Sequence, residues 1–216
     1  MKKLIFLTIF ISSICSIKGQ NTDELLHFFR LDSSDTIINT YEKVNDYYEI
    51  YKKNNLSDTV ALKYFFDNNP SKMKETFEAY NMDENEYSYS TYTKKVCPIL
   101  KRQYKNETYL IFYGIESKLY LAYYMENNDK LLRTQLVSDF SDEYGNVYLH
   151  SIIFPNYIAT VNVDNKVTYI LYEINSQNLL FTELKRVEQE LNDQTDSEIK
   201  KNILIELGIS REGIIE

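Results

Sequence analysis

Apolar residues in the first third of the chain follow a helical period. The clearest series recurs at intervals of four and three residues, the spacing of one helix face: Ile37, Tyr41, Val44, Tyr48 and Tyr51. Shorter patterns of the same kind cover 58–66, which ends before Pro70, and 71–80. We therefore expect residues 35–82 to be helical.

After about Glu86 the apolar period shortens to two, and short runs alternate with loops rich in Asn, Asp and Gly. Runs of this length joined by two- to five-residue turns predict successive antiparallel hairpins. Residues 109–113 and 167–172 are apolar at successive positions, so their strands should be central and covered on both faces. The expected strands are 87–92, 96–104, 108–115, 118–125, 131–140, 147–154, 157–163, 167–174 and 179–184.

The C-terminal stretch 187–207 has a helical pattern that Gly208 would end. Together these segments predict an α+β fold, with N-terminal helices packed on an antiparallel β-meander (87–185) and closed by a C-terminal helix. Residues 35–216 form one domain in this interpretation, and residues 20–34 form a loose leader before it.

The first nineteen residues have the layout of a secretory signal peptide. A basic start, Met1-Lys2-Lys3, precedes an apolar run over 4–14, and small Gly19 stands where a signal peptidase would cut. A spanning helix needs roughly 20 apolar residues, and this run is too short for one. We expect cleavage after Gly19 and export to the periplasm or cell envelope.

The two cysteines raise separate questions. Cys15 would mark a lipoprotein only if a small residue preceded it, and bulky Ile14 stands there, so we do not expect lipidation. After cleavage Cys97 is the remaining thiol, and no internal disulfide is possible. We expect Cys97 to be a small buried hydrophobe, with a reactive thiol as the alternative.

Composition and charge narrow the class of partner. The chain is 44% hydrophobic and 26% charged, as in a globular protein. Its net charge of −8 becomes about −11 once Lys2, Lys3 and Lys18 are removed with the signal peptide. This balance argues against a nucleic-acid partner, because binding a phosphate backbone requires clustered Lys and Arg. No stretch of the mature sequence is apolar enough to span a bilayer.

Tyrosine dominates the aromatic residues, with twenty Tyr, eleven Phe and no Trp. Tyrosine suits strands whose outer face meets water, because the ring is buried while the hydroxyl stays solvated. A sheet with one solvated face is therefore expected, and a tyrosine-lined platform for sugars or peptides is the alternative.

Motifs for chemistry are sparse. His27 lies in the leader and His150 inside a predicted strand, and no phosphate loop, dinucleotide fingerprint, nucleophile elbow or zinc spacing occurs. A Cys97–His150 dyad is conceivable, but neither residue has a catalytic motif around it. The acidic loop 139–146 could bind calcium, but its spacing is not that of an EF-hand. We expect no catalytic, metal or cofactor site; the weak candidates for catalysis are His150, Asp139, Asp142 and Glu143.

Three segments resemble uncharacterised exported proteins of Bacteroidota-type bacteria. They are Ala61-Leu-Lys-Tyr-Phe-Phe66, Thr108-Tyr-Leu-Ile-Phe-Tyr113, and Leu119-Tyr-Leu-Ala-Tyr-Tyr124 followed by Asn128-Asp-Lys-Leu-Leu132. A signal peptide ending before Gln20 also suits that group. The resemblance implies export and brings no activity or site residues with it.

The function we expect is that of a non-catalytic binding or interaction protein of the periplasm or cell envelope. Its negative charge would suit a protein partner with a basic surface, and an immunity-type protein that neutralises a toxin is one variant. The alternatives are an envelope hydrolase that uses His150 with the acids 139–143, and a structural component of the envelope.

Overall fold

The protein is mostly β in its computed structural model, which describes residues 25–32, 37–40, 54–81, 86–105, 107–139, 149–175, 178–190, 196–210 and 213–214. The predicted signal peptide and residues 41–53 of the first predicted helix lie outside this part. Ten strands form one sheet in the order β1-β5-β6-β7-β8-β9-β10-β11-β12, with β2 beside β9. Its strands are β1 (Arg30–Leu31), β2 (Ile38–Asn39), β5 (Val96–Lys105), β6 (Thr108–Ile115), β7 (Lys118–Met125), β8 (Lys130–Asp139), β9 (Leu149–Ile153), β10 (Tyr157–Val163), β11 (Lys166–Asn175) and β12 (Leu180–Glu190).

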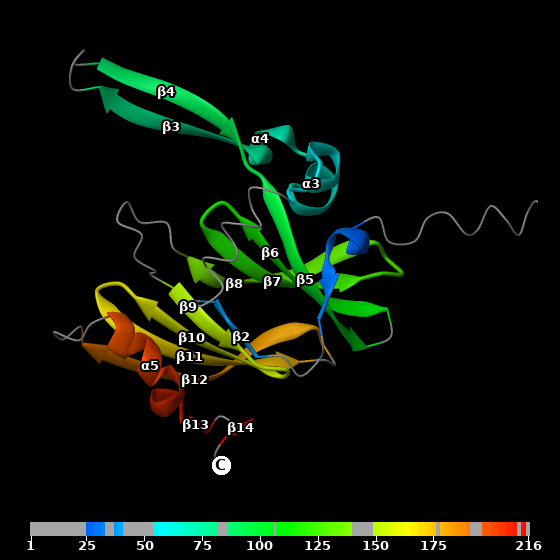
Figure 1. The fold of residues 1–216 in the computed structure, drawn as a ribbon. Coiled ribbons are helices and arrows are strands. Elements are labelled where there is room, and N and C mark those ends of the chain that lie inside the picture. The colour runs from blue at the N-terminus through cyan, green and yellow to red at the C-terminus, as the bar shows by residue number, and fades with distance from the viewer. Residues whose placement is uncertain are drawn as a thin grey trace, which may run out of the picture.

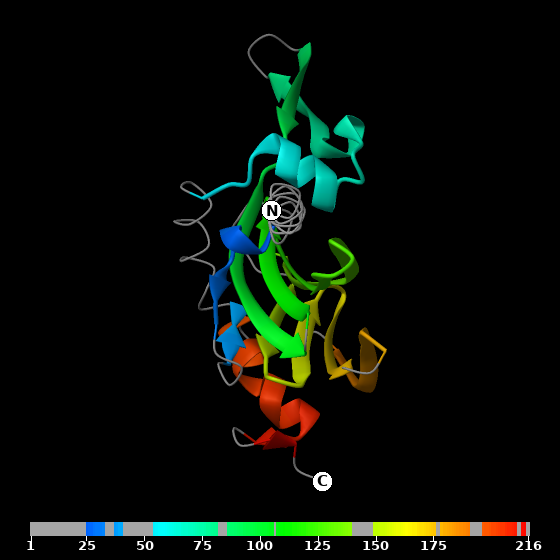
Figure 2. The ribbon, with the colours of Figure 1, turned by 90° about the vertical axis from the view of Figure 1, so that its right-hand side faces the viewer.

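The other described elements lie around this sheet (Figure 1). They are η2 (Leu26–Phe28), α3 (Asp58–Phe65), α4 (Pro70–Met73), α5 (Asp196–Leu207), the hairpin of β3 (Lys74–Asn81) and β4 (Glu86–Thr93), and the short pair β13 (Ile209–Ser210) and β14 (Gly213–Ile214). The hairpin projects from one end of the molecule, and α5 lies at the opposite end (Figure 2).

Every strand from β5 to β12 pairs antiparallel with the next in the chain. The antiparallel meander predicted from the sequence is therefore confirmed. The sheet curls so that one face of its two halves shares a core cluster, which includes Phe112, Tyr123, Val137 and Ile158. Tyr123 joins the halves: its ring stacks on Phe181 with centroids 5.0 Å apart, and its hydroxyl donates to the carbonyl oxygen of Asn175 at 3.2 Å.

The outer face of each half is apolar as well, and helices cover it. Ile111, Tyr113 and Tyr124 pack in a second cluster with residues of η2, α3 and α4. On the other half, residues of β10 and β11 meet Ile199, Ile203 and Leu207, which lie four residues apart along α5. The prediction that the strands at 109–113 and 167–172 are central and doubly covered is confirmed, since almost all their residues are buried.

The segment 25–32, placed in a leader by the sequence pattern, takes part in the fold. Leu25, Leu26 and Phe29 are buried in the second cluster. β1 then pairs in parallel with β5, opposite Leu100 and Lys101. Asp32 follows, and its carboxylate lies 3.0 Å from the guanidinium of Arg102, with side-chain exposures of 13% and 4%. A buried ion pair thus fixes this segment to the sheet.

The predicted fold class, N-terminal helices on a meander, is wrong. In the described part of residues 35–82, Thr40, α3 and the single turn of α4 are helical, while 38–39 and 74–81 are strands. Pro70 begins α4. Met73 and Phe77, which the helical spacing would place on one face, do not share an environment: Met73 is buried, whereas Phe77 is half exposed. Pairing with the β-rich segment 86–93 outweighs the helical spacing there.

The C-terminal helix is shorter than predicted for a related reason. β12 continues to Glu190 because its residues keep pairing with β11, as far as Glu190 opposite Lys166. The helix α5 is described only from Asp196. Cross-strand pairing therefore determines the structure of residues 187–190, and helical periodicity determines that of residues 196–207.

Cys97 is fully buried, which confirms the expectation of a small core residue. Burial raises the pKa of its thiol to about 12 from an ordinary 9.0. In a Cys15→Ser chain at pH 8, iodoacetamide should therefore modify native Cys97 about a thousandfold more slowly than the urea-unfolded chain, because the thiolate is the nucleophile. Equal rates in the two states would contradict this prediction.

Candidate functional site

The hairpin of β3 and β4, called the arm below, lies outside the large sheet and contributes no residue to the core clusters. Its strands have eight residues each and pair from Lys74 opposite Thr93 to Asn81 opposite Glu86. It extends away from the helices α3 and α4 (Figure 1). A two-stranded hairpin with solvent on both faces gains little from burial and is marginally stable alone.

Exposed aromatic side chains lie on both faces of the arm. Directly opposite residues of an antiparallel pair share a face, and the register therefore sorts them. The tyrosine face carries Thr76, Glu78, Tyr87, Tyr89 and Thr91, and the phenylalanine face carries Glu75, Phe77, Ser88, Ser90 and Tyr92. Tyr89 is 69% exposed, Tyr87 63% and Phe77 52%. Large aromatic side chains held in solvent are typical of an interaction surface.

Hydroxyl and carboxylate groups order the tyrosine face. The hydroxyl of Tyr89 donates to Oε1 of Glu78 at 2.6 Å, and this bond raises the pKa of Tyr89 above its ordinary value. Two residues closer to the body on the same face, the hydroxyls of Thr76 and Thr91 lie 3.0 Å apart. Cross-strand pairs therefore hold these side chains side by side.

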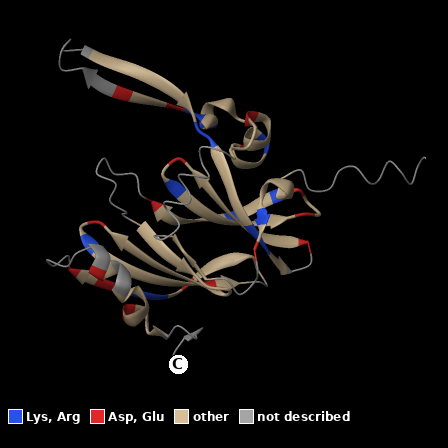
Figure 3. Ribbon diagram, viewed as in Figure 1, with Lys and Arg blue, Asp and Glu red and all other residues tan. Residues whose placement is uncertain are grey.

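The arm is acidic along its length and basic at its base. The sequence from 75 to 93 contains five carboxylic acids and no Lys or Arg, whereas Lys74, Lys94 and Lys95 flank it. Figure 3 shows the same separation, with acidic positions on β3 and basic positions where the arm meets the body. The acids are Glu75, Glu78, Asp83, Glu84 and Glu86.

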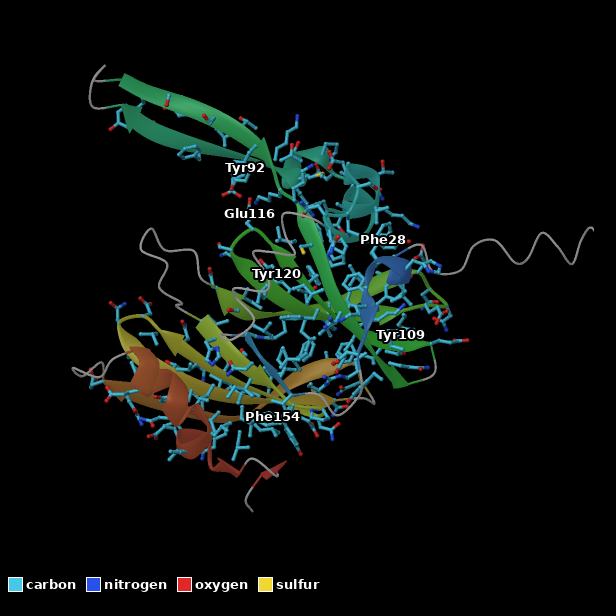
Figure 4. The ribbon with its side chains drawn as sticks, viewed as in Figure 1. Phe28, Tyr92, Tyr109, Glu116, Tyr120 and Phe154 are labelled. Atoms are coloured by element: carbon cyan, nitrogen blue, oxygen red, sulfur yellow. The ribbon has the colours of Figure 1, made fainter. Side chains whose placement is uncertain are left out.

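Polar contacts attach the base of the arm to the body. Tyr92 lies near Glu116 of the turn between β6 and β7 (Figure 4). A hydrogen bond to Glu116, with burial second, raises the pKa of Tyr92. Lys94 pairs with Glu75 at 2.6 Å, and its backbone N–H donates to the carbonyl of buried Met73 at 2.7 Å. These contacts set the direction in which the arm leaves the body.

The structure places His150, the histidine of the hydrolase alternative, in the interior. Its side chain is 2% exposed, and its Nδ1 lies 3.1 Å from the hydroxyl oxygen of Thr40. The same oxygen accepts the backbone N–H of Ser151 at 2.9 Å. Within the described structure, His150 is therefore part of a buried hydrogen-bond network.

Of the three acidic candidates, the structure describes Asp139 alone. Asp139 pairs with Lys118 at 3.0 Å, although its backbone lies opposite Leu149, the neighbour of His150. Asp142 and Glu143 lie outside the described residues. Cys97 packs with Phe112 and Leu119, and the suggested Cys97–His150 dyad would need a thiol that solvent reaches. The described residues therefore give no support to the hydrolase alternative.

Neither a metal site nor a membrane-spanning helix is found among the described residues. Their His, Cys, Asp and Glu side chains include no group of three or more placed to hold a metal ion. No described helix combines the length and apolar character needed to cross a membrane.

The arm is the feature that sequence reasoning missed. Residues 87–92 were predicted as a strand, but 74–81 were predicted as helix, so the hairpin and its exposure were not foreseen. The available signal was the alternation of Tyr with Ser and Thr over 87–93, which leaves neither face aliphatic. A strand without an aliphatic face has no side that would pack on a hydrophobic core.

Comparison of the chain with protein-family models, with curated protein sequences and with solved structures gave no match.

Proposed function

We propose that this chain is an exported, non-catalytic binding protein of the periplasm or cell envelope, which uses the arm to bind a protein partner with a basic surface. The observation that carries the proposal is the arm: it lies outside every core cluster, and it presents exposed aromatic rings among carboxylates.

The chemistry of the arm favours a basic partner. Tyrosine is enriched among residues that dominate interface binding energy, because its ring offers a large, stiff contact area and its hydroxyl a polar end. A Lys or Arg side chain over a tyrosine ring gains further attraction. The five carboxylates between 75 and 93 would attract such a partner and speed its encounter.

The proposal for the compartment is supported by the layout of residues 1–19, with a basic start, a short apolar run and Gly19 before the cut. A toxin neutralised in the periplasm would be one partner of the proposed kind, with a positively charged surface of the toxin bound to the arm. Identification of the partner decides between this immunity-type variant and other envelope partners.

Photo-crosslinking in the native cell tests the proposal. A photoreactive amino acid replaces Tyr89 on the arm or, as a matched control, Leu184 of β12, which is 50% exposed. We expect a defined crosslinked protein from position 89, weakened by high salt and absent from position 184. Its site of attachment should be rich in Lys and Arg, and the crosslinked chain should begin at Gln20.

Three results would contradict all or part of the proposal. Identical products from both positions, or none from the arm, would show that the arm is not a docking surface. A cytoplasmic protein that retains Met1 would remove the export part alone.

A further inference from the structure

We infer that the partner binds by adding a strand to the arm, on the edge of β3 that faces away from β4, and that this strand is an extended segment carrying Lys or Arg. The inference rests on the proposed function and names the mode of binding. Its basis is the backbone hydrogen-bond pattern of the arm, which directs every second residue of β3 outward.

The register of the arm identifies the backbone groups on this edge. Opposite residues of an antiparallel pair alternate between hydrogen-bonded and non-hydrogen-bonded pairs. The backbone N–H of Lys94 donates to the carbonyl of Met73 at 2.7 Å, which makes these two a hydrogen-bonded pair. The register runs on without a shift, so Thr76 and Thr91 form a non-hydrogen-bonded pair. The backbone N–H and C=O of Thr76 therefore point away from β4, and those of Glu78 do so as well.

This edge is regular and long enough to pair with another strand. Within the described structure, β3 pairs with β4 alone, over eight residues and without a bulge. Thr76 and Glu78 are exposed. Outward backbone groups on such an edge form a template for a further strand, and main-chain hydrogen bonds then supply the affinity. The arm gains from the addition, because three strands are more stable than an isolated pair.

The two ends of the large sheet are protected against strand addition, whereas β3 is not. At one end, β1 is only two residues long. At the other end, the pairing of β12 with β11 is irregular between Leu171 and Tyr172. β12 also carries the basic residues Lys185 and Arg186. Short strands, bulges and basic side chains are common protections of a sheet edge, and residues 75–81 of β3 have none of them.

Charge favours a basic strand on the edge of β3. Beyond Lys74 at its base, this strand contains Glu75 and Glu78 and no Lys or Arg. Residues of an added strand would lie directly opposite those of β3, and an opposite charge there stabilises the pair. The edge of β4 offers less, because residues 87–93 contain no acid.

Backbone-methylated peptides test this mode of binding to the full chain, by fluorescence polarisation at low salt. The probe is a labelled ten-residue peptide of alternating Thr and Arg, and two copies carry N-methyl groups on all Thr or on all Arg residues. Alternate amides of a strand point to opposite sides, so only one set would meet β3. One methylated copy should bind at least tenfold more weakly than the unmodified peptide, and the other within twofold of it.

Two proline variants test the choice of edge. Thr76 and Thr91 lie opposite one another, and the N–H of each points outward from its own strand. Proline at either position keeps the bonds between β3 and β4, and proline is tolerated where an N–H faces away from the sheet. Thr76→Pro should weaken binding of the unmodified peptide at least tenfold, and Thr91→Pro less than twofold. Circular dichroism confirms that both variants are folded.

The outcomes separate this inference from the proposed function. Equal binding of the two methylated peptides would overturn strand addition, and so would an unmodified peptide that does not bind. An effect of Thr91→Pro as large as that of Thr76→Pro would overturn the choice of β3. A dimer of the parent chain in sedimentation, dissociated by Thr76→Pro, would make a second copy the occupant and overturn the basic segment. In each case the crosslink from position 89 still tests the arm as a docking surface.

Discussion

Replacing Asp32 with alanine should lower the free energy of unfolding by about 3–5 kcal/mol, the usual effect of removing one partner from a buried ion pair. The remaining guanidinium of Arg102 is 4% exposed and would lose the carboxylate 3.0 Å away. The loss is large against the total stability of a typical domain, about 5–15 kcal/mol. Urea unfolding followed by circular dichroism measures it.

Two variants serve as controls for Asp32. Asp67→Asn removes the charge of the exposed pair with Lys72 but keeps a residue suited to the left-handed backbone at this position (φ 52°), and it should leave the unfolding midpoint unchanged. The double variant Asp32→Leu, Arg102→Met should recover much of the lost stability, because apolar residues of similar size can replace a buried pair. If Asp32→Ala unfolds at the same urea concentration as the parent, the ion pair does not hold the N-terminal segment.

Replacing Tyr123 with alanine should have a comparable effect, about 3–5 kcal/mol, as for other large buried aromatic residues. Tyr123 is fully buried, stacks on Phe181 and packs against Tyr104 with ring centroids 5.9 Å apart. Its removal leaves a cavity between the two halves of the curled sheet. Urea unfolding measures this loss as well.

Tyr123→Phe separates packing from hydrogen bonding. It keeps the ring and removes the bond to the Asn175 carbonyl, so the loss should be about 1 kcal/mol. Phe77→Ala, which changes an exposed ring of the arm, should leave the unfolding midpoint of the body unchanged. A Tyr123→Ala chain as stable as Phe77→Ala would show that the halves do not depend on this contact.

The meander could be predicted from the sequence because its signals are local. Turn residues such as Asp164-Asn165 separate runs of strand-forming residues, and each strand pairs with its neighbour in the chain. The double coverage of β6 and β11 was readable because both faces of these strands are apolar. Pairing between adjacent segments needs no knowledge of distant contacts.

The wrong predictions concern residues whose structure depends on contacts with residues far away in the sequence. Residues 74–81 carry an apolar spacing that fits a helix, and only the pairing with 86–93 makes them a strand. Leu25 and Phe29 gave no sign of burial, because their partners Val96 and Ile111 lie far along the chain. β1 beside β5 is a parallel pair that no turn signal marks.

The same difference between local and distant contacts explains what could be predicted of the candidate site. His150 was named from the sequence only as a weak catalytic candidate, because its partner Thr40 lies 110 residues away, a contact that no local pattern shows. The acidic and tyrosine-rich composition of the arm was visible in the sequence. Its solvent exposure depends on the absence of any covering element within the described structure, which composition does not reveal.

The strand order has a consequence for how the chain assembles. Pairing from β5 to β12 closes only short loops, whereas β1 must find β5 some seventy residues later and β2 must find β9 more than a hundred residues later. Closing a loop costs more entropy as the loop lengthens. The meander is therefore the part that forms at low entropic cost, and the N-terminal strands add to an existing sheet, where Asp32 and Thr40 hold them once docked.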